Sequence, residues 1–416
     1  MPNISNLSGR LVFDSRGSKA LEFDVITDKK FLGRACAPSG ASVGKHEAQG
    51  FPQNNPERAL ATIQSYQSRF IGIDASNIKD VFDVLRSIDG TETYSIIGGA
   101  VAYAISVASV DSASKALNIP LFKLLKPEGP YAFPYPLGNI LGGGAHAGPG
   151  TPDIQEILVC PIGAKNIVEA LEMNFQIHKK ARSVIEDLDP NFTYGRGDEG
   201  GWAPRLDNDR ALEIAERAVK NSGYNLGTEV SLGIDFASSS FWDERKRIYN
   251  YRRQGIARNR EEQIDYVNEL VKQYKLIYVE DPVNEEDFEG ASIITRENKG
   301  CITSGDDMLV TNTSRAKLAE RYKACSGAIL KVNQAGSLYE AMNFANTCSV
   351  HGIKIVTSHR SGESIDSHLT HIGVAADSIM LKAGIVGGER VSKLNELIRL
   401  MEYDLIDGMA ELLSAK

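Results

Sequence analysis

The stretch KLIYVEDP at residues 275–282 decides the fold, because an apolar strand-like run ends there in two adjacent carboxylates. Five further runs have the same form: VSLGIDFA (230–237), GCITSGDD (300–307), GAILKVN (327–333), IKIVTSH (353–359) and SIMLKAG (378–384). From Glu280 on, the polar ends of these runs recur about every 25 residues, the length of one strand, one helix and two loops. Apolar strands that alternate with helices indicate a parallel sheet covered by helices, and this many units favours a (β/α)8 barrel.

Such a barrel gathers the polar strand ends on one face, where the chemistry of these folds takes place. The six runs end in Asp235, Glu280, Asp306, Lys331, His359 and Lys382. Singly, each motif also fits an ordinary structural role, such as a turn at EDP or a helix cap at GDD. Together, three carboxylates in one site would repel one another unless a hard cation such as Mg²⁺ neutralised them. We expect the two lysines to flank that cation.

Residues 1–126 are predicted to form a separate domain. The short strand-like runs GRLVFDS, LEFDVITD and FLGRACA come first, and helical stretches follow near 56–70, 78–88 and 97–117. The segment LLKPEGPYAFPYP, rich in proline, is the best domain boundary. We therefore expect an α/β protein in which residues 127–416 form a modified (β/α)8 barrel and residues 1–126 form an N-terminal α+β capping domain.

Composition argues against several classes of function. The net charge of -8 does not suit a general nucleic-acid binder, which needs a basic face. No apolar run approaches the roughly 20 residues that cross a bilayer, and the N-terminus lacks a signal-peptide core. The five cysteines are scattered without CxxC spacing, which favours buried thiols. We expect a cytoplasmic protein with neither a nucleic-acid nor a membrane partner.

Several loops carry residues that could bind or react. GRGDEGGWAP (195–204) could be a solvated turn, an exposed RGD adhesion tripeptide, or a catalytic acid in a sharply bent backbone. SHRSG (358–362) offers an arginine and hydroxyls that suit a phosphate or carboxylate, and otherwise it is a solvated loop. PSGASVGKHE (38–47) is a small-residue loop that either closes over a site or links two elements at the surface. The GGG before HAGPG lacks the GxGxxG spacing of a dinucleotide site.

These motifs together resemble the enolase family, the phosphopyruvate hydratases. The resemblance rests on PSGASVG, GGGAHAG, IQE, GDEGGWAP, LGIDFASS, VEDP, GDDMLVTN, LKVNQAGS, SHRSGES and GERVSKLNELIR, which occur in family order and nearly end to end. It implies a capping domain on a modified barrel, two Mg²⁺ ions, and a homodimer or higher homo-oligomer. The implied reaction is the reversible dehydration of a small phosphorylated substrate, 2-phosphoglycerate, to phosphoenolpyruvate.

The resemblance also implies roles for individual residues. Asp235, Glu280 and Asp306 match the ligands of the tighter Mg²⁺, and Ser42 matches the ligand region of the second ion. Lys331 matches the base that takes the C2 proton, and Glu199 matches the acid that helps the C3 hydroxyl to leave. The implied substrate pocket comprises Lys382 on the carboxylate, Arg360 and Ser361 on the phosphate, and His146, Gln155, Glu156 and His359.

This chemistry sets expectations for the acid and the base. Neighbouring cations should lower the pKa of Lys331, and burial or nearby carboxylates should raise the pKa of Glu199. The glycines around Glu199 should let the acid approach the substrate closely.

The chain also departs from the usual family pattern, for example with SGASVG for SGASTG and SGESID for SGETED. These departures indicate a divergent, archaeal-like member, and they affect loop closure and subunit contacts more than chemistry. Two alternatives stay open: a related dehydratase that acts on another carboxylate, and a non-catalytic binding protein that kept the fold.

Overall fold

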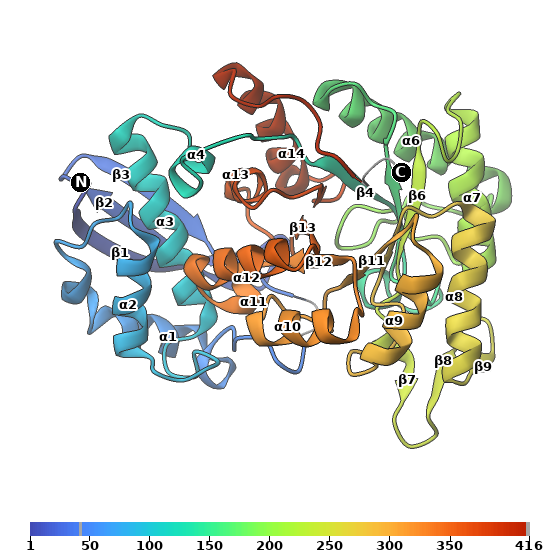
Figure 1. Ribbon diagram of the computed structural model, residues 1–416, viewed down its shortest axis with the longest axis horizontal. Coiled ribbons are helices and arrows are strands. Elements are labelled where there is room, and N and C mark those ends of the chain that lie inside the picture. The colour runs from blue at the N-terminus through green and yellow to red at the C-terminus, as the bar shows by residue number, and fades with distance from the viewer. Residues whose placement is uncertain (41–43, 413–416) are drawn as a thin grey trace.

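A closed barrel of eight strands forms the larger part of the protein in this computed structural model, which describes residues 1–40 and 44–412 (Figure 1). Around the barrel the strand order is β10-β11-β12-β13-β14-β4-β5-β6. The strands are β4 (Tyr135–Gly142), β5 (Glu156–Cys160), β6 (Ser231–Asp235), β10 (Tyr278–Glu280), β11 (Ile302–Gly305), β12 (Gly327–Leu330), β13 (Lys354–Ser358) and β14 (Met380–Lys382). The predicted modified (β/α)8 barrel is confirmed.

The modification of the barrel is the direction of β5. This strand runs antiparallel to both neighbours, β4 and β6, whereas the other neighbouring pairs are parallel. Reversal brings the start of β5 to the end of the barrel where the other strands finish, so Glu156 pairs in register with Asp235. A side chain from the beginning of one strand therefore joins side chains from the ends of the others.

Helices cover the outside of the barrel. The longer ones are α6 (Ile167–Leu188), α7 (Asn208–Asn221), α8 (Arg260–Tyr274), α9 (Phe288–Glu297), α10 (Thr313–Tyr322), α12 (Leu338–Val350), α13 (His368–Ala375) and α14 (Gly388–Leu400), with short turns at α5 (Gly144–Ala147) and α11 (Val332–Ala335). A small antiparallel sheet of β7 (Trp242–Asp243), β8 (Ile248–Tyr251) and β9 (Ile256–Arg258) follows β6. Among the described residues, no helix has the length and apolar character needed to cross a membrane.

The N-terminal domain lies at one side of the barrel (Figure 1). Its antiparallel sheet consists of β1 (Ile4–Phe13), β2 (Lys19–Thr27) and β3 (Phe31–Cys36), and its helices are α1 (Pro56–Gln64), α2 (Ile78–Ile88), α3 (Gly99–Leu117) and α4 (Leu121–Leu125). α3 packs on β2 and β3 and also contacts α11 and α12. Its alanines and serines are buried through most of its length, as expected for a helix that packs closely on several sides.

The five cysteines are all buried and free. Burial raises the pKa of the Cys36 thiol to about 12, so this thiol is protonated and unreactive at neutral pH. The expectation of buried thiols without a disulfide framework is confirmed.

Candidate active site

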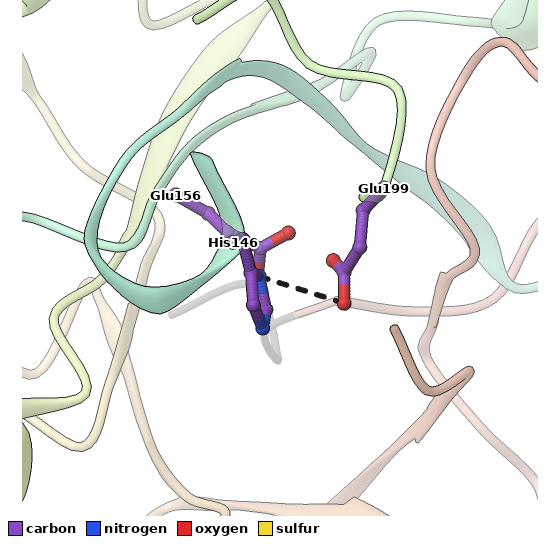
Figure 2. Close-up of side chains that lie close together, drawn as sticks. All are labelled: His146, Glu156 and Glu199. Carbon is purple, nitrogen blue, oxygen red and sulfur yellow. Dashed lines mark ion pairs between the residues drawn. The ribbon is translucent and has the colours of Figure 1, made fainter. Parts of the chain in front are cut away.

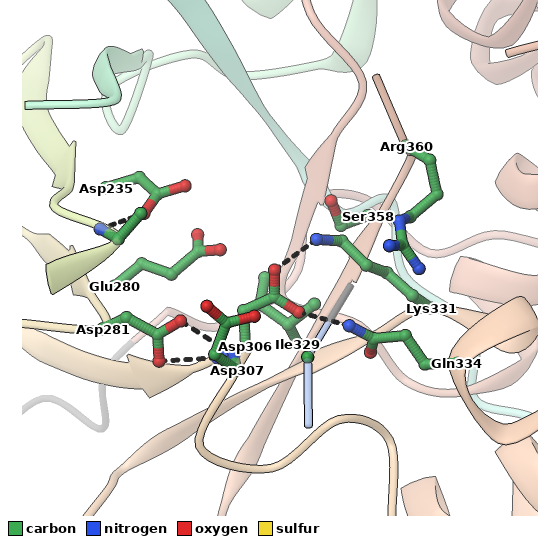
Figure 3. A network of polar contacts seen from close by, with 12 residues as sticks. Asp235, Glu280, Asp281, Asp306, Asp307, Ile329, Lys331, Gln334, Ser358 and Arg360 are labelled. Atoms are coloured by element: carbon green, nitrogen blue, oxygen red, sulfur yellow. Dashed lines mark hydrogen bonds and ion pairs between the residues drawn. The ribbon is translucent and has the colours of Figure 1, made fainter. Parts of the chain in front are cut away.

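Carboxylates from several strand ends meet at the end of the barrel, near Lys331 (Figure 3). Asp235 and Glu280 are the last residues of β6 and β10, and Lys382 is the last residue of β14. The Nζ atom of Lys382 lies 2.8 Å from Asp235 Oδ2 and 2.8 Å from Glu280 Oε2. Lys331, directly after β12, forms an ion pair with Asp306, directly after β11. The strand ends therefore converge as predicted, with the lysines in contact with the carboxylates.

Two residues that the sequence left without a role complete this cluster. The Oδ1 and Oδ2 atoms of Asp281 accept the backbone N–H groups of Asp306 and Asp307 at 3.0 and 2.8 Å. Gln334 Nε2 donates to Asp306 Oδ1 at 2.8 Å, while Lys331 holds Oδ2. The sequence contains a hint of both residues. Asp281 directly follows the predicted ligand Glu280, and Gln334 lies three residues after the predicted base Lys331.

The crowding of carboxylates changes their pKa values. Burial and the charge of Asp235 raise the pKa of Glu280 to about 7, and burial and Asp306 raise the pKa of Asp307 to about 8. Oxygen atoms of Asp281, Asp306 and Asp307 all lie within 4.8 Å of one another. Glu280 Oε1 is buried and has no hydrogen-bond partner among the described residues. This all-oxygen set with excess negative charge suits a hard divalent cation.

The expected lowering of the Lys331 pKa does not appear in the structure. Burial lowers the pKa of this buried ammonium, and Arg360 and Lys382 lower it further. The carboxylates of Asp306 and Glu280 oppose these effects and together outweigh them, so the net pKa of Lys331 lies above the usual value. Lys331 would lose its proton more easily if another positive charge neutralised Asp306.

A second group of titratable side chains lies beside the first and includes Glu199 (Figure 2). Glu199 Oε2 lies 3.1 Å from His359 Nε2, and Glu199 Oε1 lies 3.6 Å from His146 Nδ1. Glu156 forms an ion pair with Lys382 and accepts a hydrogen bond from Asn139 at 2.5 Å. Polar atoms of His146, Glu156 and Glu199 all lie within 4.8 Å of one another.

The two buried glutamates compete for one proton. Burial and the negative charge of Glu199 raise the pKa of Glu156 well above its usual value. Burial also raises the pKa of Glu199, but the imidazoles of His146 and His359 oppose it, and the net pKa lies well below the usual value. The expectation that Glu199 itself has the raised pKa is therefore wrong for this structure, because its imidazole neighbours favour the anion and Glu156 takes the proton.

The GRGDEGGWAP loop that carries Glu199 rests on the barrel and on α6. A Cβ at Gly200, where φ is +84°, would collide with the carbonyl oxygen of Val386, and one at Gly201 would collide with Asn139 Oδ1. His178 Nε2 donates to Gly200 O at 3.0 Å. The glycines thus allow close packing against the protein, and the expected close approach to a substrate does not account for them.

The same loop is not a free adhesion tripeptide. Asp198, the acid of RGD, forms a 3.0 Å ion pair with Arg16 from the loop between β1 and β2. Its carboxylate is therefore engaged by the capping domain.

The SHRSG loop faces the same site. Arg360 is buried, and its Nη1 lies 3.0 Å from Glu47 Oε2 of the capping domain and 3.3 Å from Asn333 Oδ1. Ser361 Oγ is buried without a hydrogen-bond partner among the described residues. Glu47 was not predicted, although it stands in the small-residue loop KHE. The expected second-ion residue Ser42 lies outside the described residues.

One polar cavity unites these groups. Its lining includes Glu47, His146, Gln155, Glu199, Asp235, Asp306, Asp307, Lys331, Arg360, Ser361 and Lys382. Gln155 Nε2 also donates to Asp235 Oδ2 at 3.2 Å. Three predicted residues lie just behind this lining. His359 contacts Glu199. Glu156 and Glu280 both contact Lys382. Of the predicted site residues, all that the structure describes are brought together here.

A larger cavity, of about 550 Å³, lies elsewhere, between the capping domain and α13 and α14. It is lined by mixed charges such as Arg34, Asp111, His368 and Glu396. It contains none of the strand-end carboxylates or lysines. We therefore place the candidate active site in the smaller cavity, which most of these carboxylates and lysines line.

The capped barrel and its polar site define a barrel enzyme whose site is built from strand ends and the loops beside them. Residues 130–410 match the family model described as "Enolase, C-terminal TIM barrel domain", and residues 4–125 match "Enolase, N-terminal domain". The chain is 42% identical to the enolase of Methanosphaera stadtmanae, covering 98% of this chain and 99% of that protein. It is 41% identical to the enolase of Methanothermobacter thermautotrophicus (98% and 99%) and 38% identical to that of Pyrobaculum aerophilum (96% and 96%). The chain belongs to the enolase family.

Proposed function

We propose that the protein is a hydro-lyase that reversibly dehydrates 2-phosphoglycerate to phosphoenolpyruvate and depends on Mg²⁺. The observation that carries this proposal is a single cavity lined by an acid, Glu199, and a base, Lys331, with carboxylates and cations between them. Membership of the enolase family supports it.

Lys331 is the base that removes the C2 proton, and Glu199 is the acid that gives a proton to the departing C3 hydroxyl. Removal of a proton next to a carboxylate is difficult because negative charge builds up on that carboxylate. Lys382, buried among carboxylates, supplies a fixed positive charge close to where this charge develops. Because Glu156 holds the proton of this pair, Glu199 gives the leaving hydroxyl a proton that it receives from Glu156.

Arg360 and Ser361 hold the substrate phosphate. The guanidinium is preorganised by Glu47 and Asn333, and the buried hydroxyl of Ser361 is available as a donor. His146, Gln155 and His359 complete the walls of the pocket around the acid.

Asp235, Glu280 and Asp306 would hold the tighter Mg²⁺, with Ser42 near a second ion. The unpaired oxygen of Glu280 and the raised pKa values of Glu280 and Asp307 fit a cation site. Asp281 is occupied by backbone N–H groups, so we assign it to holding the end of β11. When bound, the ions stabilise negative charge on the substrate carboxylate. The division at residues 126 and 127, a homo-oligomeric assembly and a cytoplasmic location stay predictions.

The decisive experiment separates the acid from the base. Wild-type protein with Mg²⁺ should form phosphoenolpyruvate from 2-phosphoglycerate and exchange the C2 hydrogen with deuterium. Lys331→Ala should abolish both processes, because no base remains to begin the reaction. Glu199→Gln should lose dehydration by a factor on the order of 10² or more but keep measurable exchange, because only the general acid is lost.

NMR in deuterated water measures the exchange, and absorbance of the product measures the dehydration. Loss of exchange in Glu199→Gln together with its retention in Lys331→Ala would reverse the two roles. Dehydration at the wild-type rate in both variants would show that this cavity is not the active site. No reaction of the wild-type protein with 2-phosphoglycerate would contradict the proposed function itself.

A further inference from the structure

A buried arginine behind the site contacts two of its loops. Arg390, in the first turn of α14, is among the largest fully buried side chains. Its Nη1 lies 2.7 Å from His359 Nδ1 and donates to Arg360 O at 2.7 Å. Its Nη2 donates to Ser361 O at 2.7 Å and to Asp198 O at 3.0 Å. The only carboxylate near it is Glu389, at 3.3 Å from Nε, among the ion pairs of the described residues.

The contact between Arg390 and His359 determines which imidazole nitrogen has a proton. A guanidinium is always protonated and has no lone pair to accept a hydrogen bond. His359 Nδ1, at 2.7 Å from it, must therefore be the acceptor and must lack a proton. The proton of the neutral ring then lies on Nε2, which faces Glu199 Oε2 at 3.1 Å.

We propose that Arg390 is a positioning residue that fixes His359 in the Nε2–H tautomer, so that this ring donates a hydrogen bond to Glu199. The opposite tautomer would turn a lone pair of Nε2 towards the carboxylate oxygen, and the two atoms would repel each other. Glu199 would then lose its donor and turn away from the pocket. The inference rests on the proposed function only for the role of Glu199.

The charge state of His359 agrees with this geometry. Burial and the positive charge of Arg390 lower the pKa of His359 to about 4, while Glu199 opposes them. The ring is therefore neutral at physiological pH, and a neutral ring has one donor and one acceptor nitrogen.

The three carbonyl contacts of Arg390 extend the same function to the backbone. Arg360 O and Ser361 O belong to the loop of the proposed phosphate site, and Asp198 O belongs to the loop of the acid. One rigid, planar group thus sets the distance between the acid and the anion-binding residues. A point donor such as lysine cannot hold these divergent acceptors in one plane.

Lys393, one turn later on α14, provides a matched control. It is also buried, and its Nζ donates to Ser364 O at 3.0 Å and Asp366 O at 2.9 Å, and it forms a 2.9 Å ion pair with Glu363. It therefore holds the same loop from the same helix, but its hydrogen bonds and ion pairs within residues 1–40 and 44–412 do not include His359. Lys393→Met removes a buried cation and loop contacts without removing the proposed tautomer control.

The test is a ¹⁵N NMR measurement of the histidine tautomers in labelled full-length protein near pH 7, with the His359 signals assigned through a His359→Asn variant. We expect wild-type His359 to show an unprotonated Nδ1 and a protonated Nε2. Arg390→Met should give a mixture of tautomers or the Nδ1–H form, and Lys393→Met should keep the wild-type form. A wild-type ring with a proton on Nδ1 overturns the proposal even if Arg390→Met fails to fold.

Two further results would also overturn it: an unchanged tautomer in folded Arg390→Met, or an equal tautomer change in Lys393→Met. As a second readout, Arg390→Met should lower dehydration about tenfold or more relative to C2 exchange, whereas Lys393→Met should leave that ratio unchanged. An unchanged ratio in Arg390→Met contradicts the link to Glu199. Because the tautomer is measured without substrate, failure of the proposed 2-phosphoglycerate activity is distinguishable from failure of this inference.

Discussion

The guanidinium of Arg360 has a carboxylate partner within the protein, because Glu47 lies 3.0 Å away in the buried interface with the capping domain. A substrate phosphate must therefore share this arginine with Glu47. The planar fork of arginine can serve two acceptors on different edges, whereas an ammonium is a single point.

Arg360→Lys is expected to raise the KM for 2-phosphoglycerate by about ten- to a hundredfold, the range of one charged hydrogen bond. Binding of glycerate, which lacks the phosphate, should change much less. Steady-state kinetics and competition assays measure the two effects, with Arg210→Lys on the exposed face of α7 as the control. Equal losses for both compounds would favour a substrate without phosphate.

Two histidines behind the acid make stability sensitive to low pH. Burial lowers the pKa of His178 to about 4, and burial also lowers the pKa of His359 to about 4, against roughly 6.5 for an unfolded histidine. Between these values the unfolded state binds more protons, so stability should fall as the pH falls from about 6.5 towards 4. Each histidine contributes at most about 1.4 kcal/mol per pH unit in this window.

His178→Gln should reduce the steepness of this acid loss by about one proton, while the amide can still donate to Gly200 O. Urea unfolding at several pH values measures it, with exposed His351→Gln as the control. An acid dependence as steep as that of the wild type would show that His178 takes up its proton equally in both states.

The loop that carries Glu199 has its shape because of its neighbours. Gly200→Ala should destabilise the protein by about 1–3 kcal/mol, because the new Cβ meets the backbone of Val386 and the residue has a positive φ. It should also lower activity, since Glu199 is the adjacent residue. In Gly195→Ala the new Cβ meets nothing within 4 Å, so stability should change by no more than about 0.5 kcal/mol. Thermal unfolding and the dehydration assay compare the two; similar losses would contradict the packing explanation.

The strands could be predicted from the sequence better than their surroundings. Runs such as KLIYVEDP predict both a buried strand and a polar residue at its end, because the strand leaves the barrel there. The reversal of β5 could not be predicted, since IQEILVC has the same apolar pattern in either direction. Arg390 and Lys393 look like ordinary positions of an amphipathic helix, and only the fold places them behind the SHRSG loop. The pKa values of Glu199 and Lys331 depend on side-chain contacts that spacing does not give.

For the molecule as a whole, the crowded carboxylates should couple metal binding to stability. Mg²⁺ at a hundred times its dissociation constant should stabilise the folded state by about 2.7 kcal/mol, because the unfolded chain lacks the site. Asp306→Ala should lose both this stabilisation and the activity. Thermal unfolding with and without a chelator measures the effect, with Asp187→Ala at an exposed acid as the control. Full activity in chelated protein would refute the metal requirement.

The pairing of β14 with β4 closes the barrel, and these strands lie about 250 residues apart in the chain. At a translation rate of about 5–20 residues per second, roughly 10–50 s pass between the synthesis of the two strands. During that interval the edge of β4 has no partner and could pair with another nascent chain. β14 also brings Lys382, the counter-charge of Asp235 and Glu280. The growing polypeptide therefore obtains the hydrogen bonds that close its barrel and the counter-charge of its site in one late step.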